Sequence, residues 1–143
     1  MTILVTGGLG YIGSHTVVEL LNNNFEVVII DDLSNTEKFI LKNIEEISGK
    51  KPIFYPFDLK RKELLKQVFD AHKIEGCIHF AAYKAVGESQ VKPIDYYENN
   101  LFSLINLLQE MKERNISNFI FSSSCTVYGQ ADKMPIDENT PLK

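Results

Sequence analysis

Apolar residues along this chain fall into short continuous runs and into longer segments with helical spacing. Five short apolar runs predict strands at residues 2–6, 26–31, 53–57, 77–80 and 118–122. Four segments with apolar residues three or four positions apart predict helices at residues 11–23, 37–47, 61–72 and 93–114. Strands and helices therefore alternate along the chain, and the polar stretch after Gly129 is expected to be loop.

The order and composition of these segments predict the fold class. The run Val27 to Ile30 is β-branched throughout, which is typical of a parallel strand buried on both faces. Alternating strands and helices of this kind predict a doubly wound α/β sheet, Rossmann-like, with strand order 3-2-1-4-5 and ending after the fifth strand. In the second helix, Phe39, Ile40, Ile44 and Ile47 are expected on the buried side.

A glycine-rich turn follows the first predicted strand and opens the first helix, over residues 7–13. Gly7 or Gly8 allows a tight turn with positive φ. Gly10 allows the backbone to approach a pyrophosphate, and Gly13 allows the helix to pack on the strand. No Ser, Thr, Asp or Asn stands at the start of this helix to cap it, so a bound phosphate could take that place. A turn that binds nothing is the alternative.

Two acidic positions at strand ends are candidates for holding an adenosine. Asp31 ends the second strand, eighteen residues after Gly13, where a carboxylate can accept hydrogen bonds from ribose hydroxyls. It would repel a 2′-phosphate and has no Arg beside it, which favours NAD over NADP. Asp58 could accept from the adenine amino group, with Leu59 as an apolar wall. The alternatives are a turn-capping role for Asp31 and a helix N-cap role for Asp58.

Composition and charge exclude several classes of function. The net charge of −4 and the scattered Lys and Arg residues argue against a nucleic-acid-binding surface. No apolar run approaches the ~20 residues of a membrane span, and the first residues lack the features of a signal peptide. Cys77 and Cys125 have no metal-ligand spacing and are expected to be small core residues in a reducing compartment. We therefore expect a soluble, cytoplasmic protein without a metal site.

Four segments together resemble the extended short-chain dehydrogenase/reductase family, and within it the UDP-glucose 4-epimerases. The resemblance covers essentially the whole chain. Its motifs are Thr6-Gly7-Gly8-Leu9-Gly10-Tyr11-Ile12-Gly13-Ser14-His15, His79 through Ser89, Asn99-Asn100 in the long helix, and Phe121-Ser122-Ser123-Ser124-Cys125-Thr126-Val127-Tyr128-Gly129. The first motif is shared by many sugar-nucleotide enzymes, whereas the stretches 84–89 and 122–129 are more specific to epimerases.

The resemblance also implies roles for individual residues. Ser124 would hydrogen-bond the sugar hydroxyl that is oxidised, and Lys84 would lie near the ribose and phosphates of NAD. Plainer interpretations are that Ser122 and Ser123 only end a strand, that Lys84 is a solvated loop charge, and that His15 and His79 are packed or hydrogen-bonded histidines and not catalysts. The predicted cofactor-binding residues are Gly7, Gly10, Tyr11, Ile12, Gly13, Asp31, Asp58, Leu59, Phe80, Ala81, Ala82, Lys84, Asn99 and Ser122.

One family feature is not found between residues 1 and 143. The family's catalytic Tyr-x-x-x-Lys motif is absent, because none of the six tyrosines has Lys four residues later. We therefore expect the chain to be the incomplete NAD-binding domain of an enzyme that interconverts UDP-glucose and UDP-galactose through a 4-keto sugar. On its own it should be inactive, and the whole enzyme is expected to be a homodimer paired through the 93–114 helix. The alternatives are a nucleotide-sugar 4,6-dehydratase and a non-catalytic NAD-binding module.

Overall fold

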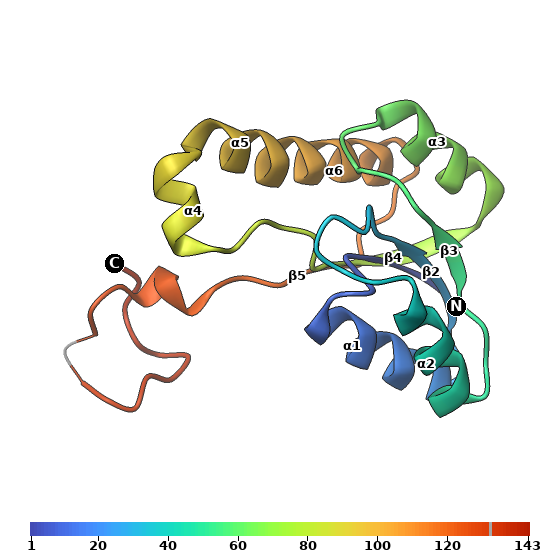
Figure 1. The fold of residues 1–143 in the computed structure, drawn as a ribbon, viewed down its shortest axis with the longest axis horizontal. Coiled ribbons are helices and arrows are strands. Elements are labelled where there is room, and N and C mark those ends of the chain that lie inside the picture. Colours follow the sequence, from blue (N-terminus) through green and yellow to red (C-terminus); the bar gives the residue numbers. More distant parts are fainter. Residues whose placement is uncertain (132) are drawn as a thin grey trace.

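A five-stranded sheet crosses the molecule in the order β3-β2-β1-β4-β5 (Figure 1). The computed structural model describes residues 1–131 and 133–143. The strands are β1 (Thr2–Thr6), β2 (Glu26–Ile30), β3 (Ile53–Tyr55), β4 (Ile74–His79) and β5 (Phe119–Phe121). Every neighbouring pair is parallel, so the predicted doubly wound sheet and its strand order are confirmed.

Helices cover both faces of the sheet (Figure 1). One face carries α1 (Tyr11–Asn22) and α2 (Phe39–Ser48), and the other carries α3 (Lys62–Ala71) and α6 (Ser103–Glu113). Alternate residues of β1 pack against the helices on opposite faces of the sheet, since Leu4 lies in one core cluster and Val5 in the other. Each fully buried Leu or Val contributes about 1.5–3 kcal/mol, so the two clusters fix the sheet between its helices.

The predicted long helix from Pro93 is divided into three parts. It consists of α5 (Pro93–Tyr97), a π-helical turn (Glu98–Phe102) and α6. A further short helix, α4 (Val86–Val91), precedes it and was not predicted. None of the residues of α4 is buried, so its sequence carries no apolar periodicity that could reveal it.

The expected buried side of α2 is wrong in part. Ile44 is buried, but Phe39 and Ile47 are 61% and 70% exposed. Phe39 precedes Ile44 by five residues, which places it about 140° away around the helix. Ile47 lies in the last turn, just before the helix ends at Gly49.

The two cysteines have different surroundings. Cys77 is buried in β4, and burial raises the pKa of its thiol to about 12. Cys125 is exposed and opens a short 3-10 helix (Cys125–Tyr128), so its assignment to the core is wrong. The apolar pattern around Cys125 resembles a strand, but β5 already ends at Phe121, four residues earlier.

The polar stretch after Gly129 leads away from the sheet (Figure 1). Residues 130–131 and 133–143 hold no helix or strand, as predicted. The same prediction for Asp132 lies outside the described residues. Within the described part of the chain, no helix is long and apolar enough to cross a membrane.

Candidate functional site

Most of the predicted site residues follow the carboxyl ends of the five strands. Because the strands are parallel, these ends meet at one edge of the sheet. The glycine turn follows β1, Asp31 follows β2, and Asp58 lies three residues after β3. Phe80 follows β4 and Ser122 follows β5. The fold therefore brings together groups that are far apart in the sequence.

The glycine turn is shaped by close backbone contacts. Gly7 has φ +67°, and a Cβ there would lie 2.7 Å from the backbone N of Ala81. A Cβ on Gly13 would lie 2.2 Å from the Gly7 carbonyl oxygen. Gly10 differs, because a Cβ there would meet only the Gly7 oxygen, at 3.2 Å. Gly7 and Gly13 are thus required by the protein's own packing, whereas Gly10 leaves its outer side open.

The start of α1 offers backbone donors without acceptors. No side chain caps this end, and the first turn holds no acidic residue. The first hydrogen bond of the helix runs from the Ser14 N–H to the Gly10 carbonyl oxygen, at 2.8 Å. The N–H groups of Tyr11, Ile12 and Gly13 come before it and are left for an acceptor outside the helix. The side chains of Tyr11 and Ile12 are 80% and 54% exposed beside them.

Asp31 is buried and already engaged by the protein. Its Oδ1 accepts from the Leu33 N–H at 3.0 Å and from the Thr36 hydroxyl at 2.7 Å. Its Oδ2 accepts from the Leu9 N–H at 3.1 Å, which ties the glycine turn to the end of β2. A carboxylate has about four acceptor sites, so Oδ2 retains one for a further donor such as a ribose hydroxyl. The turn-capping alternative is therefore real, and it leaves room for a ligand.

Asp58 forms an Asx turn and does not cap a helix. Its Oδ1 accepts from the Lys60 N–H at 2.8 Å, and Lys60 Nζ lies 3.4 Å from Oδ2. The cap position of α3 is occupied by Arg61, so the expected N-cap alternative does not apply. Leu59 is 4% exposed and packs in the core cluster with Leu65. Its side chain offers almost no surface as the expected apolar wall, because tertiary packing turns it inward.

The loop after β4 is held at two points. The Phe80 N–H donates to the Thr6 carbonyl oxygen at 3.0 Å, which fixes the start of the loop beside Gly7. Further along, the Asn100 side chain bonds both the N–H and the carbonyl of Tyr83. Ala82 and Lys84 lie exposed between and after these points, and Ala81 is half-buried.

The remaining candidates lie on the π-helical turn and after β5. Asn99 is 8% exposed and donates to the Asn100 Oδ1 at 3.2 Å. The Ser122 N–H donates to the His79 carbonyl oxygen, as expected of a residue that continues β5. Ser124 is exposed, and its Oγ accepts from the Thr126 N–H at 3.3 Å and the Thr126 hydroxyl at 2.9 Å. The Ser124 proton remains for an acceptor outside this turn.

His79 is a packed residue, as the plainer interpretation holds. It is 2% exposed, its Nδ1 lies 2.7 Å from the Thr6 hydroxyl, and its ring stacks on Phe121. Burial lowers the pKa of His79 to about 4, so the ring is neutral at pH 7. His15 lies on the surface of α1 with its ring edge against Tyr11.

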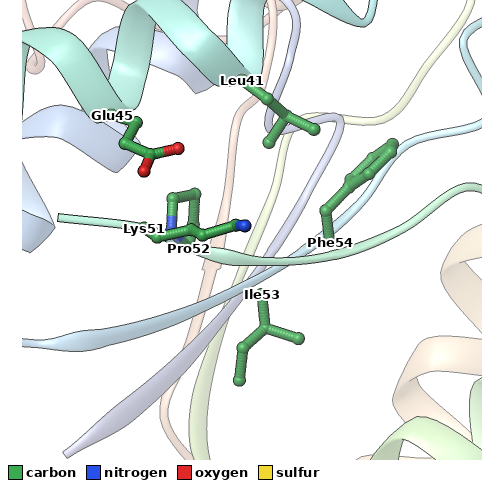
Figure 2. Close-up of a pocket in the computed structure, with 6 residues that line it drawn as sticks. All are labelled: Leu41, Glu45, Lys51, Pro52, Ile53 and Phe54. Atoms are coloured by element: carbon green, nitrogen blue, oxygen red, sulfur yellow. The ribbon is translucent and has the colours of Figure 1, made fainter.

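A surface hollow of about 420 Å³ lies at the other end of β3 (Figure 2). Leu41 and Glu45 of α2 line one wall, and residues 51–54 line the other. Ile53 begins β3, so this hollow is at the amino end of the strand, whereas the candidate site is at the carboxyl ends. A second hollow lies over Tyr11, Ile12 and His15, next to the glycine turn.

Asn100 and Asn106 were missed by the sequence reasoning, although both touch loops that carry candidates. Asn106 on α6 donates to the carbonyl oxygens of Leu59 and Lys60. Asn106 is half-buried on α6, and no spacing in the sequence reveals its bonds, because its partners are distant in the sequence. The pair Asn99-Asn100 was the one available hint.

Comparisons with known proteins give a dehydratase family model and UDP-glucose 4-epimerase relatives. Residues 4–143 match the family model described as GDP-mannose 4,6 dehydratase. The chain is 49% identical over 142 residues to the UDP-glucose 4-epimerase of Erwinia amylovora, a match that covers 99% of this chain and 42% of that protein. A UDP-glucose 4-epimerase sequence from Klebsiella pneumoniae is 48% identical over 139 residues, with 97% of this chain and 100% of that sequence covered.

Solved structures of UDP-glucose 4-epimerases also match this chain. The crystal structure of UDP-glucose 4-epimerase from Bifidobacterium longum in complex with NAD+ and UDP matches with a TM-score of 0.96 and 46% identity. The match covers 100% of this chain and 43% of that one. The chain thus spans about two fifths of the length of such relatives, and its counterpart there is the amino-terminal part.

Proposed function

This chain belongs to the UDP-glucose 4-epimerase family, and on that premise we propose that it binds NAD along the carboxyl ends of its five strands. The observation that carries the proposal is the start of α1. There a glycine turn with an open outer side meets uncapped N–H groups, beside the end of β2 that bears Asp31. Such a turn suits a pyrophosphate.

The strand order gives the proposed NAD a direction. β2 and β3 lie on one side of β1, and β4 and β5 lie on the other. Asp31 and Asp58 would receive the adenosine on the first side, with the free acceptor site of the Asp31 Oδ2 available to a ribose hydroxyl. Phe80, Ala81, Ala82, Lys84, Asn99 and Ser122 would line the nicotinamide half on the second side.

We further propose that the whole enzyme interconverts UDP-glucose and UDP-galactose through a 4-keto sugar. Bound NAD would accept a hydride from the sugar and return it. Ser124 would orient the sugar, because its Oγ already accepts two bonds from Thr126 and its proton is free to donate to a sugar oxygen. The tyrosine and lysine that the family uses as acid and base have no counterpart between residues 1 and 143.

A coupled assay for UDP-glucose formed from UDP-galactose tests the activity. It compares this chain with one extended through the Tyr-x-x-x-Lys segment and the rest of the enzyme. We expect turnover only in the longer chain, since loss of a positioned acid/base costs 10²–10⁴-fold in rate. Comparable turnover by both would identify a base within residues 1–143, and Tyr128 would be examined first. NAD binding without turnover in the longer chain would instead favour a non-catalytic module.

The dehydratase description of the matching family model supports a second candidate. A 4,6-dehydratase also eliminates water and needs a further acid and base. By the resemblance, those enzymes carry acidic residues directly after the serine at the fifth strand. Cys125 and Thr126 occupy that place, in the 3-10 turn capped by Ser124. Release of a 4-keto-6-deoxy sugar by the longer chain would favour the dehydratase.

We also propose that the whole enzyme is a homodimer paired through α5 and α6. Apolar side chains at intervals of three and four residues stand exposed along this helix, a spacing that forms one face. They are Ile94, Tyr97, Leu101, Ile105 and Leu108, which are 41–72% exposed. A role in galactose metabolism and a cytoplasmic location, in keeping with the two free thiols, complete the proposal.

A further inference from the structure

Two side-chain amides on the long helix bond to the backbone of loops that carry proposed cofactor residues. Asn100 accepts from the Tyr83 N–H at 2.8 Å and donates to the Tyr83 carbonyl oxygen at 3.0 Å. Asn106 donates to the carbonyl oxygens of Leu59 at 3.1 Å and Lys60 at 3.3 Å. Tyr83 precedes Lys84, and Leu59 follows Asp58.

We infer that Asn100 and Asn106 are positioning residues for the cofactor. Each holds the backbone of a loop that forms one half of the proposed site. Asn100 holds the loop that presents Lys84, and Asn106 holds the loop that presents Asp58. The inference rests on the proposed NAD site and deepens it, because it assigns the two halves of NAD to two separate supports.

Asn100 holds the backbone of the Lys84 loop directly, whereas the Tyr83 ring contacts Tyr96 only through its side chain. Residues 80–85 form no regular structure, and Tyr83 is 37% exposed. The Asn100 amide bonds both backbone groups of Tyr83, as a neighbouring strand would do. The Asn99 amide donates to the same Asn100 oxygen at 3.2 Å and thereby orients it.

Two consecutive asparagines lie on the π-helical turn, where one contacts the Lys84 loop and the other contacts its neighbour. Glu98–Phe102 contains both, and such wide turns are frequent at functional sites. Asn99 is buried there, and Asn100 is half-buried against the loop. The neighbouring contacts support the same arrangement, since the Tyr83 and Tyr96 rings lie 5.4 Å apart and the Tyr96 hydroxyl donates to Glu88 at 2.9 Å.

Asn106 acts at the other side of the glycine turn. The order β3-β2-β1-β4-β5 separates the loop after β3 from the loop after β4 by the pyrophosphate turn of β1. In the proposed arrangement, a ligand that contains only adenosine and one phosphate would contact the loops after β2 and β3 and would not reach Lys84, which lines the nicotinamide half. 5′-AMP and NAD therefore distinguish the two supports.

The test measures affinities for NAD and 5′-AMP by calorimetry on the full chain. We expect Asn100→Ala to weaken NAD binding about tenfold and leave 5′-AMP binding unchanged, and Asn106→Ala to weaken both about tenfold. The matched control is Gln109→Ala, which removes an amide on the same helix that accepts a bond from Lys62 Nζ and touches no candidate loop among the described residues, and should change neither affinity. A general loss of stability in Asn100→Ala would weaken the binding of NAD and of 5′-AMP alike.

A double-variant cycle tests whether Asn100 acts through Lys84. Lys84→Met with Asn100→Ala should bind NAD no more weakly than Lys84→Met alone, because the loop then has no charge to position. Should Asn100→Ala not fold, Asn100→Asp keeps the acceptor for the Tyr83 N–H, removes the donor, and serves in the same cycle. Additive losses would overturn the inference.

Other outcomes separate this inference from the proposed function. If the wild-type chain binds NAD but Asn100→Ala binds it equally well, or loses 5′-AMP and NAD alike, the inference is wrong and the proposed function stands. If the wild-type chain binds no NAD, the proposed function fails and the inference fails with it.

Discussion

Asp31 combines a structural and a proposed selective role in one carboxylate. It holds the glycine turn through the Leu9 N–H and would repel a 2′-phosphate on the ribose. We predict that Asp31→Asn, which keeps the size of the side chain but removes its charge and replaces one acceptor oxygen with a donor, reduces the preference for NAD over NADP about tenfold, or about 1.4 kcal/mol. Competition titrations of both cofactors at one salt concentration measure it. An unchanged preference would remove Asp31 as the selector.

His79 should make the stability of the chain depend on pH. Its folded pKa is about 4 against 6.5 for an ordinary histidine, so between these values the unfolded chain binds a proton that the folded chain does not. Stability present above pH 6.5 is therefore lost as the pH falls, by about 2 kcal/mol between pH 7 and pH 5. Urea unfolding at the two pH values measures this loss. His79→Gln should show a clearly smaller one, and an equal loss would contradict the assignment.

At the residue scale, the sequence predicted which positions lie at strand ends but not how each side chain is used. Asp58 was recognised as a candidate, yet its Asx turn with Lys60 depends on where α3 begins. Leu59 was expected to face a ligand and instead fills the core beside Leu65. Tertiary packing decides which way such side chains point, and the local sequence pattern holds no information about that packing.

At the scale of elements, the glycine turn ties β1 to α1. A Cβ on Gly13 would lie 2.2 Å from the Gly7 oxygen, a backbone atom that cannot move without moving the turn. We predict that Gly13→Ala destabilises the chain by about 1–3 kcal/mol and weakens NAD binding. Thermal unfolding and calorimetry measure the two effects.

Gly87 in α4 is the matched control for Gly13. A Cβ there meets nothing within 4 Å, so Gly87→Ala should be neutral or stabilising by about 0.5–1 kcal/mol, as alanine favours a helix. Equal effects of the two substitutions would show that the close contact at Gly13 is unimportant.

The elements with strong apolar patterns were predicted, and those without were not. β2 lies between two helical layers, and its burial on both faces is visible in the sequence as a continuous apolar run. The short α4 and the 3-10 helix after Ser124 bury no residue, so neither has a periodic face. The π-helical turn has the same apolar spacing as its neighbours and was read as ordinary helix.

For the whole molecule, the exposed apolar side chains of α5 and α6 predict self-association. Tyr97 and Leu101 are 66% and 47% exposed at the centre of that face. We predict that the double variant Tyr97→Glu, Leu101→Glu shifts the whole enzyme from dimer to monomer in light scattering, because buried carboxylates without partners are costly. Ile47→Glu, on α2 across the sheet, should leave the dimer intact (Figure 1). Dimers in both variants would place the interface elsewhere.

The edge strand β5 is a second apolar surface. It pairs only with β4, and Ile120 and Phe121 are 61% and 50% exposed. Unpaired apolar edges promote aggregation, so this chain is expected to associate unless further residues cover the edge.

The central claim is that NAD lies along the strand ends with its pyrophosphate at the glycine turn. Calorimetry of NAD binding to the full chain and to Gly10→Ala tests this most directly. Gly10 has φ −66°, and a Cβ there meets only one protein atom, so the variant should fold while its new methyl group occupies the space next to the phosphates. The account predicts saturable binding of one NAD per chain and at least tenfold weaker binding by Gly10→Ala. Absence of saturable binding, or equal affinity in the folded variant, would contradict it.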